Sequence, residues 1–196
     1  MKRKWQKYIN NNKIGADCQL VTAVNAYYYL TGKTVDDATY EKYVDLCGCR
    51  HGSAVNIEKI WKKLGIEVVW EGNFLSDLVG RRKTKRKTKM PLPIEFRAWS
   101  MEYGFHSTLI VNSVANPCCY RITNFKKNST HDGWIFDSEL YKYKSFCSQR
   151  DGNMYRLFGL KGDKKYRALK ERSKRNKREW FKTYKKYYSD RLKEMQ

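Results

Sequence analysis

The sequence is short of acidic residues and of histidine, and it contains no long apolar run. Its 196 residues include 20 Asp and Glu against 41 Lys and Arg, and only three His. The absence of a run of about 20 apolar residues argues against a membrane-spanning helix. No apolar segment follows the basic N-terminus, so we expect no signal peptide. We therefore expect a cytoplasmic chain whose six cysteines are thiols or ligands before they are disulfides.

The formal net charge of +21 predicts a polyanionic partner, either nucleic acid or an acidic surface. Residues 81–89 carry seven positive charges and no acidic residue, which is typical of an exposed insertion. Residues 161–196 hold fifteen Lys and Arg against five Asp and Glu. The residues predicted to contact the polyanion are Arg81, Arg82, Lys83, Lys85, Arg86, Lys87, Lys174, Arg175, Lys177 and Arg178.

The first half of the chain predicts helices. Between Asp17 and Gly32, apolar residues recur every three or four positions, which favours a helix with Asp17 as N-cap and Gly32 at its C-terminus. The pattern also predicts that Tyr8 and Ile9 of the irregular lead-in tuck against the core. The elements expected next are a helix at 34–44 with Thr34 as N-cap, a helix at 54–64 and a strand at 66–70.

The second half predicts a sheet followed by a basic tail. Short runs rich in β-branched and aromatic residues, separated by Gly, Asn and Pro, are typical of antiparallel strands. They lie at residues 94–99, 105–113, 118–125, 133–136 and 155–160. We predict an α+β domain over residues 1–160, with N-terminal helices packed on an antiparallel sheet, and a long basic helix within 161–196.

Cys18 is the strongest candidate nucleophile. As the first residue of the expected helix it meets unpaired backbone N–H groups and the positive end of the helix dipole, which both favour a thiolate. The thiolate is the reactive form of cysteine. Most cysteines, however, are simply buried, so the interpretation depends on finding a base.

His106 is the histidine best placed to be that base. It opens an expected strand that enters the core, whereas His51 and His131 lie in turns or loops. Asn124, near the end of the next strand, is the best-placed residue to orient the imidazole, with Asn112 and Asp132 as weaker alternatives. The Cys18 backbone N–H and the side chain of Asn12, or less favourably Asn11, are candidate oxyanion donors.

The order Cys, His, Asn resembles that of papain-like cysteine peptidases. More narrowly, Asn12, the Asp17-Cys18 pair, the small-and-apolar helix that ends in Gly32, residues 52–66 and the 106–111 segment resemble the C39 and C39-like branch. The resemblance covers about residues 10–140 and implies thiolate attack on an amide, a thioester intermediate, a peptide or protein substrate and no cofactor. Gln19 stands where the family usually has Gly and Asn12 where it has Gln, which predicts slow or absent turnover.

Three other interpretations stay open. Residues 17–21 also resemble NlpC/P60 wall peptidases, which implies a peptidoglycan substrate, and a small basic chain of this kind would suit a phage product. A catalytically inactive scaffold would bind nucleic acid through its basic tail, where aromatic residues interleave with Lys and Arg, or would serve as a structural virion protein. A zinc site would need Cys47, Cys49, His51 and Cys118 or Cys119, at spacings that zinc rarely uses; Cys147 carries no such signal.

Overall fold

The structure is a computed structural model that describes most of the chain. The described residues are 7–9, 13–14, 16–51, 56–72, 92–100, 104–112, 119–123, 134–136 and 154–194. The predicted insertion at 81–89, and with it six of the predicted polyanion contacts, lies outside these residues, as do Asn12 and Asn124.

The N-terminal part of the chain forms helices. They are α1 (Cys18–Thr31), α2 (Asp37–Cys47), the short 3-10 helix η2 (Cys49–His51) and α3 (Ile57–Leu64). Gly32, Gly48 and Gly65 follow α1, α2 and α3 with positive φ, the conformation that glycine tolerates best at a helix C-terminus. The first of these confirms the predicted end of the helix at Gly32.

The strands form one antiparallel sheet in the order β1-β6-β2-β3-β4-β5. Every pairing among them is antiparallel, so the predicted α+β class is confirmed. The last strand, β6, lies between β1 and β2, which no local pattern in the sequence indicates. The strands are β1 (Ile66–Gly72), β2 (Ile94–Ser100), β3 (Gly104–Asn112), β4 (Cys119–Thr123), β5 (Trp134–Phe136) and β6 (Met154–Leu160).

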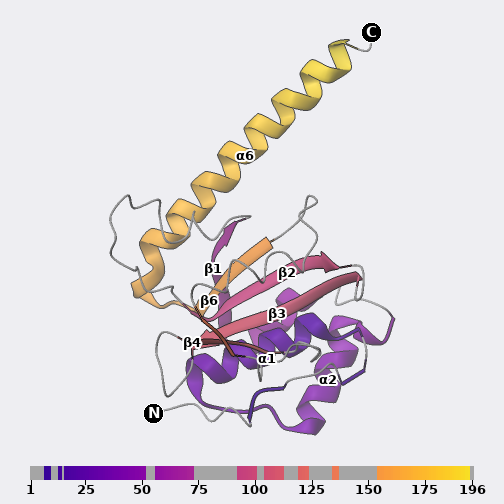
Figure 1. The fold of residues 1–196 in the computed structure, drawn as a ribbon, viewed down its shortest axis with the longest axis vertical. Helices are drawn as coiled ribbons and strands as arrows, with labels where there is room; N and C mark the ends of the chain where they lie inside the picture. Colours follow the sequence, from indigo (N-terminus) through magenta and orange to yellow (C-terminus); the bar gives the residue numbers. More distant parts are fainter. Residues whose placement is uncertain are drawn as a thin grey trace.

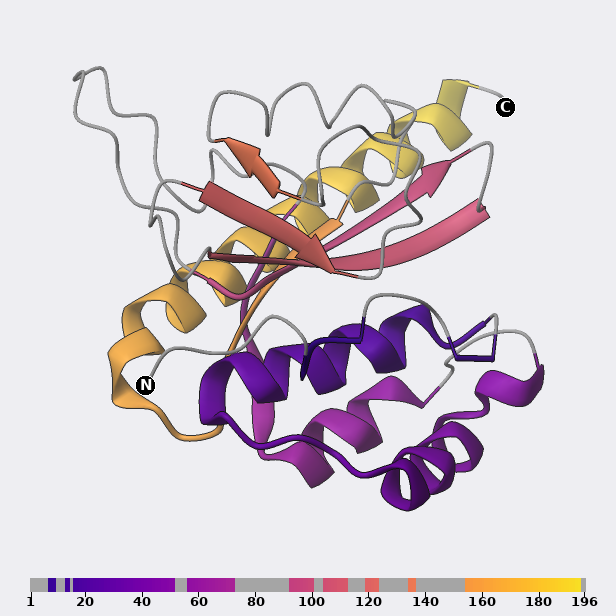
Figure 2. The ribbon, with the colours of Figure 1, turned by 60° about the horizontal axis from the view of Figure 1, so that its bottom comes forward.

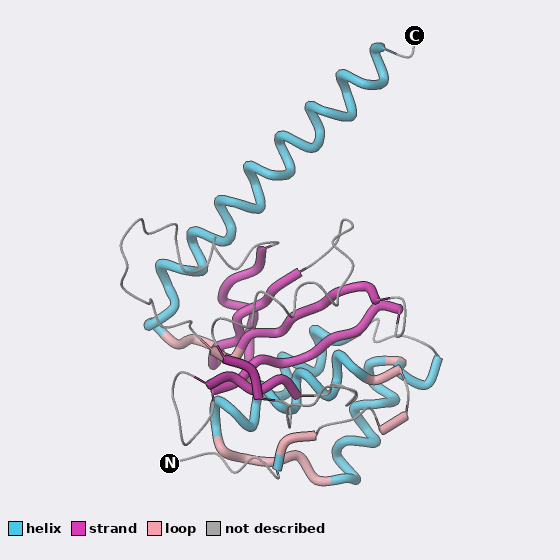
Figure 3. Tube along the Cα trace, in the orientation of Figure 1, coloured by secondary structure: helices cyan, strands magenta, loops and turns pink. Residues whose placement is uncertain are grey.

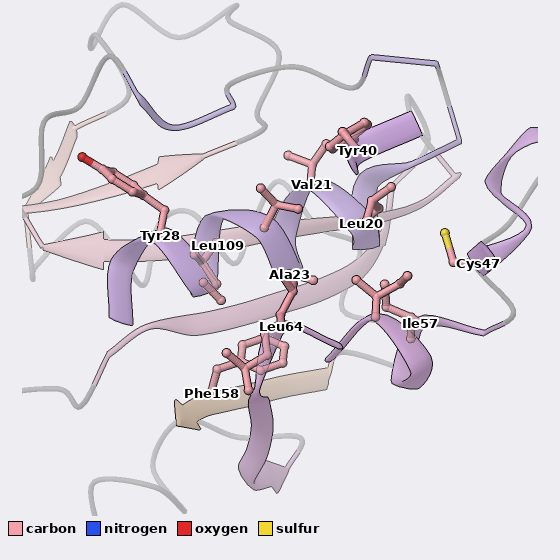
Figure 4. Close-up of a cluster of buried hydrophobic side chains, with 14 of the residues drawn as sticks. Leu20, Val21, Ala23, Tyr28, Tyr40, Cys47, Ile57, Leu64, Leu109 and Phe158 are labelled. Carbon is pink, nitrogen blue, oxygen red and sulfur yellow. The ribbon is translucent and has the colours of Figure 1, made fainter. Parts of the chain in front are cut away.

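Helices α1, α2 and α3 cover one face of the sheet, and α1 lies against β3 (Figure 2). Their apolar side chains form a core cluster with Leu109 and Val111 of β3 and Phe158 of β6. Figure 4 shows this cluster, with Cys47 at one end of it near Leu20 and Ile57.

Helix α1 is the central helix of this layer. The predicted apolar stripe understates its burial, because every residue from Leu20 to Ala26 is buried, including Thr22 and Asn25. The Asn25 side chain accepts a hydrogen bond from the Ile9 backbone N–H (2.9 Å) and donates one to the Ile9 carbonyl (2.8 Å). These bonds hold the lead-in segment on the core, where Tyr8 is buried, as predicted.

Two predicted helix starts are wrong. Asp36, not Thr34, is the N-cap of α2, and its carboxylate accepts a hydrogen bond from the Thr39 backbone N–H (2.8 Å). Helix α3 begins at Ile57 after the N-cap position Asn56, not at residue 54. Both errors reflect competition between several capping residues close together, which sequence alone does not resolve.

The C-terminal helix α6 (Arg167–Glu194) follows a 3-10 turn, η3 (Lys164–Tyr166). It packs on the edge strand β1 and then extends away from the rest of the molecule (Figures 1 and 3). Along one stripe of the helix, Lys170 pairs with Glu67 (2.5 Å), the Glu71 backbone N–H donates to Ser173 Oγ (3.0 Å), and Lys177 pairs with Glu71 (2.6 Å). Its first turns are thus docked by polar contacts. Within the described residues, no helix combines the length and apolar character that crossing a membrane requires.

Candidate active site

Cys18 is the first residue of α1, as predicted, and is partly exposed. One helical turn later, Thr22 Oγ1 lies 3.1 Å from Ser107 Oγ of β3. Residues four apart lie on the same side of a helix, so Cys18 and Thr22 face the same part of β3. Consistent with this, the backbone amide of Ser107 acts directly on the Cys18 thiol. The start of α1 therefore lies against β3 at the residue that follows His106.

Asp17 occupies the N-cap position but its side chain does not cap α1, so that part of the prediction is wrong. The fully buried carboxylate turns toward the preceding segment and accepts hydrogen bonds from the backbone N–H groups of Lys13 (3.1 Å) and Ile14 (3.4 Å). It also accepts one from the Tyr40 hydroxyl (2.6 Å). Burial and this bond raise the Tyr40 pKa, so the hydroxyl stays protonated. Asp17 therefore fixes the chain around Cys18.

The pKa of the Cys18 thiol is raised above its ordinary value because burial disfavours the thiolate. The backbone amides of Ser107 and Gln19 act in the opposite direction, as the helix terminus predicts, but do not outweigh burial. Glu95 raises the pKa further and Arg97 lowers it. The prediction that the helix terminus alone makes Cys18 ionise is thus wrong. The thiol needs a base to activate it.

A buried polar chain leads from this site across the sheet. Ser107 Oγ donates to Glu95 Oε1 of β2 (2.5 Å), and Arg156 Nη1 of β6 donates to Glu95 Oε2 (3.4 Å). Glu95 is only 1% exposed, so these hydrogen bonds replace the water that its carboxyl group would otherwise bind. No local pattern in the sequence indicates Glu95 and Arg156, because they lie 61 residues apart and meet through the β2–β6 pairing.

The same chain continues to the C-terminal helix. Arg156 Nε donates to Glu71 Oε1 of β1 (3.0 Å), and Lys177 of α6 donates to Glu71 Oε2 (2.6 Å). Burial raises the pKa of Glu71, but these two cations hold it below its ordinary value overall. A series of polar and charged contacts therefore connects Ser107 of β3, beside Cys18, with Lys177 in the first half of α6.

His106 lies next to the Cys18 contact along β3, but its strand position is unfavourable. Ser107, Leu109 and Val111 face α1, and β2 and β3 pair without a register shift from Ile94 to Ser100. Because successive side chains of a strand point to opposite faces, this regular alternation directs His106 to the face away from α1. The Cys18–His106 pair stays a prediction, and Asn124 and Asn12 lie outside the described residues.

The predicted polyanion residues of α6 lie on the described part of that helix. The side chains of Lys174, Arg175, Lys177 and Arg178 are exposed, although Lys177 also pairs with Glu71. Lys174 pairs with Glu171 on the same helix (3.2 Å). Exposed ion pairs of this kind are weak and leave the cations available to a stronger anion.

A second thiol site lies at the end of α2. Cys47 and Cys49 are buried free cysteines whose sulfur atoms are 2.9 Å apart. With His51, they are three of the predicted zinc ligands. Among the described residues, no group of three or more His, Cys, Asp or Glu side chains is arranged to hold a metal ion. Cys118 of that predicted set lies outside these residues.

Comparisons with known proteins add no family to these observations. No protein-family model matches the chain, and neither the curated proteins nor the solved structures contain a match.

Proposed function

We propose that this chain is a cysteine hydrolase that cleaves an amide bond in a peptide or protein, with Cys18 as the nucleophile. The observation that carries the proposal is the position of Cys18. It is a partly exposed thiol at the N-terminus of the central helix, against the strand residue that follows His106. The resemblance to C39-like peptidases supports the same chemistry.

The proposed reaction follows from the groups at this helix terminus. The Cys18 thiolate attacks the amide carbonyl, the amine leaves with a proton, and water hydrolyses the resulting thioester. The first backbone N–H groups of a helix have no partner within the helix, so the Cys18 N–H is a suitable oxyanion donor. Asn12 is the proposed second donor. Because burial raises the pKa of Cys18, the reaction needs a base, and His106 is the residue proposed for it.

The role of His106 depends on the conformation of the start of β3. Its strand register points it away from α1, so the imidazole reaches Cys18 only if the start of β3 turns from regular alternation when substrate binds. Catalytic contacts in enzymes often tighten only in the substrate complex.

Labelling with a peptidyl chloromethyl ketone, followed by peptide mapping, tests the proposal on the full chain. We expect labelling of Cys18 in the wild type, complete loss in Cys18→Ala, strong reduction in His106→Ala, and no change in the matched control Cys147→Ala.

Full labelling of His106→Ala would exclude His106 as the base. Cleavage of a peptide library or of purified peptidoglycan would then separate a peptidase of C39-like type from a wall hydrolase. Absence of Cys18 labelling would overturn the proposal.

The exposed cations of α6 favour a second candidate function, nucleic-acid binding. A helix that extends from the body with Lys174, Arg175 and Arg178 exposed can follow a phosphate backbone (Figure 1). We expect binding of duplex DNA or RNA, measured by fluorescence anisotropy, to weaken steeply with salt and to fall on substitution of these three residues by Gln. Lys62→Gln/Lys63→Gln on α3 is the matched control, since both side chains are exposed. An affinity for nucleic acid that changes neither with salt concentration nor with the α6 substitutions would exclude this function.

A further inference from the structure

We propose that Cys47 and Cys49 form a reversible dithiol–disulfide site, in which Cys47 attacks a hydroperoxide and Cys49 resolves the product. This site is separate from the proposed Cys18 chemistry and does not depend on it.

The turn between α2 and η2 brings the two sulfur atoms together. Cys47 is the last residue of α2, Gly48 follows with φ 77°, and Cys49 begins η2. The left-handed Gly48 reverses the chain so that the two side chains meet with their sulfur atoms 2.9 Å apart. A disulfide bond is about 2.05 Å long, so closing the bond moves the sulfur atoms together by less than about one ångström.

The two thiols differ in the way that this reaction requires. The hydrogen bond with Cys49 lowers the pKa of Cys47 to about 7, while the same bond raises the pKa of Cys49. Near pH 7 the Cys47 thiol is therefore partly ionised; in its protonated form it can donate to the Val44 carbonyl oxygen, 3.7 Å from its sulfur. A thiolate next to a protonated partner has the arrangement of an attacking and a resolving cysteine.

The reaction balances with a hydroperoxide as the named oxidant. The Cys47 thiolate attacks the peroxide oxygen and the O–O bond breaks, which leaves Cys47 as a sulfenic acid. The hydroxide or alkoxide that leaves takes a proton from solvent and becomes water or an alcohol. The Cys49 sulfur then attacks the Cys47 sulfur, the S–O bond breaks, and the hydroxide leaves as water with the Cys49 proton. Two thiols are oxidised to one disulfide and the peroxide is reduced.

The surroundings of the pair favour this reaction over metal binding. Within the described residues, the pair has no third metal-ligating side chain arranged beside it. The negative charge of Asp17 raises the pKa of both thiols, but the hydrogen bond between the two sulfur atoms outweighs it at Cys47. The pair is buried, at 0% and 1% exposure, so a small oxidant such as a hydroperoxide suits it better than a bulky disulfide.

Trypsin isolates the site for a direct test. Cleavage after Lys42 and Arg50 gives peptide 43–50, whose only cysteines are Cys47 and Cys49, and cleavage after Lys13 and Lys33 gives peptide 14–33, whose only cysteine is Cys18. The full chain is treated with hydrogen peroxide, alkylated and mapped by mass spectrometry. We expect peptide 43–50 to lose two hydrogens and both alkylation sites, and to regain both after treatment with dithiothreitol.

Two variants assign the roles of the cysteines. In Cys49→Ser we expect peptide 43–50 to gain two or three oxygens, because the sulfenic acid at Cys47 has no resolving thiol. In Cys47→Ser we expect Cys49 to stay alkylatable. Circular dichroism shows whether each variant folds. The mapping of the wild-type protein tests the disulfide even if a variant does not fold. The proposal is overturned if peptide 43–50 keeps both alkyl groups at a peroxide dose that oxidises Cys18, or if it gains oxygens in the wild type. Reversed behaviour of the two variants would overturn the assignment of Cys47 as the attacking thiol.

Discussion

The two thiol sites of this molecule contradict a simple expectation about helix ends. Cys18 stands at a helix N-terminus, where the dipole favours a thiolate, yet its pKa is raised. Cys47 stands at a helix C-terminus, where the dipole opposes a thiolate, yet its pKa is lowered to about 7. A direct hydrogen bond joins the Cys47 and Cys49 sulfur atoms, 2.9 Å apart, and lowers the Cys47 pKa, whereas the backbone amides near Cys18 do not offset its burial. A specific donor therefore decides ionisation more strongly than the position of a cysteine along a helix.

The largest expected effect is the loss of the Cys47 thiolate in Cys49→Ala. At pH 7 a thiol with a pKa of about 7 is about half ionised. Without its donor, we expect the Cys47 pKa to return to 9.0 or above, which lowers the ionised fraction at pH 7 about 50-fold. The ultraviolet absorbance of thiolate, measured from pH 5 to 9 as the difference between wild type and variant, reports the change without needing reagent access.

Cys47→Ala is the control for this titration, because it removes the same thiolate outright. The two variants are expected to give the same difference spectrum near pH 7. If the wild type shows no titration near pH 7 that Cys47→Ala removes, the contrast between the two thiol sites is not real.

The next effect concerns Asp17, which precedes Cys18 and also acts on Cys47 and Cys49. Tyr40→Phe removes the hydroxyl that donates to its buried carboxylate, and we expect a loss of about 1–2 kcal/mol in the free energy of unfolding at pH 7. The pKa of Tyr40 is raised on folding, so its contribution is present below the ordinary pKa of about 10 and is lost as the pH rises beyond it.

Urea denaturation of wild type and Tyr40→Phe at pH 7 and above pH 10 measures both parts of this prediction. The difference between the two proteins is expected to shrink at the higher pH. Tyr43→Phe, on the same helix, keeps the Tyr40–Asp17 bond and is the matched control. An equal loss of stability in both variants would show that Asp17 does not depend on Tyr40.

The elements of the fold could be predicted from the sequence, but most contacts at the two thiol sites could not. Apolar periodicity predicts α1, and the β-branched runs predict the strands, because both signals are local. The place of β6 between β1 and β2 depends on pairing across the whole chain, and the Glu95–Arg156 contact depends on that pairing in turn.

Predictions from local sequence were also wrong where two physical effects compete. The sequence identifies Asp17 as an N-cap and Cys18 as a reactive thiol, but it does not show that the carboxylate turns toward Tyr40 or that burial outweighs the helix end. The Cys-Gly-Cys spacing likewise leaves open whether two thiols bind a metal or each other. The structure shows that they meet across Gly48, which has a positive φ.

The smallest expected effect tests whether charges on the sheet tune Cys18 alone. Glu95 and Arg97 lie two residues apart on β2, on the face where Ser107 and Cys18 meet, and they shift the Cys18 pKa in opposite directions. We expect Glu95→Gln to lower that pKa and Arg97→Gln to raise it, each by a small amount, since both act through charge alone and are the last of the causes that shift it. The pH dependence of iodoacetamide alkylation, followed on tryptic peptide 14–33, measures the Cys18 pKa. Peptide 43–50 serves as the internal control, because neither charge is among the main influences on Cys47 or Cys49. Shifts of the same sign in both variants, or equal shifts in both peptides, would mean that a change of fold rather than local charge controls the thiol. Opposite shifts confined to Cys18 would show that the contrast between the two sites is set by the few groups around each sulfur.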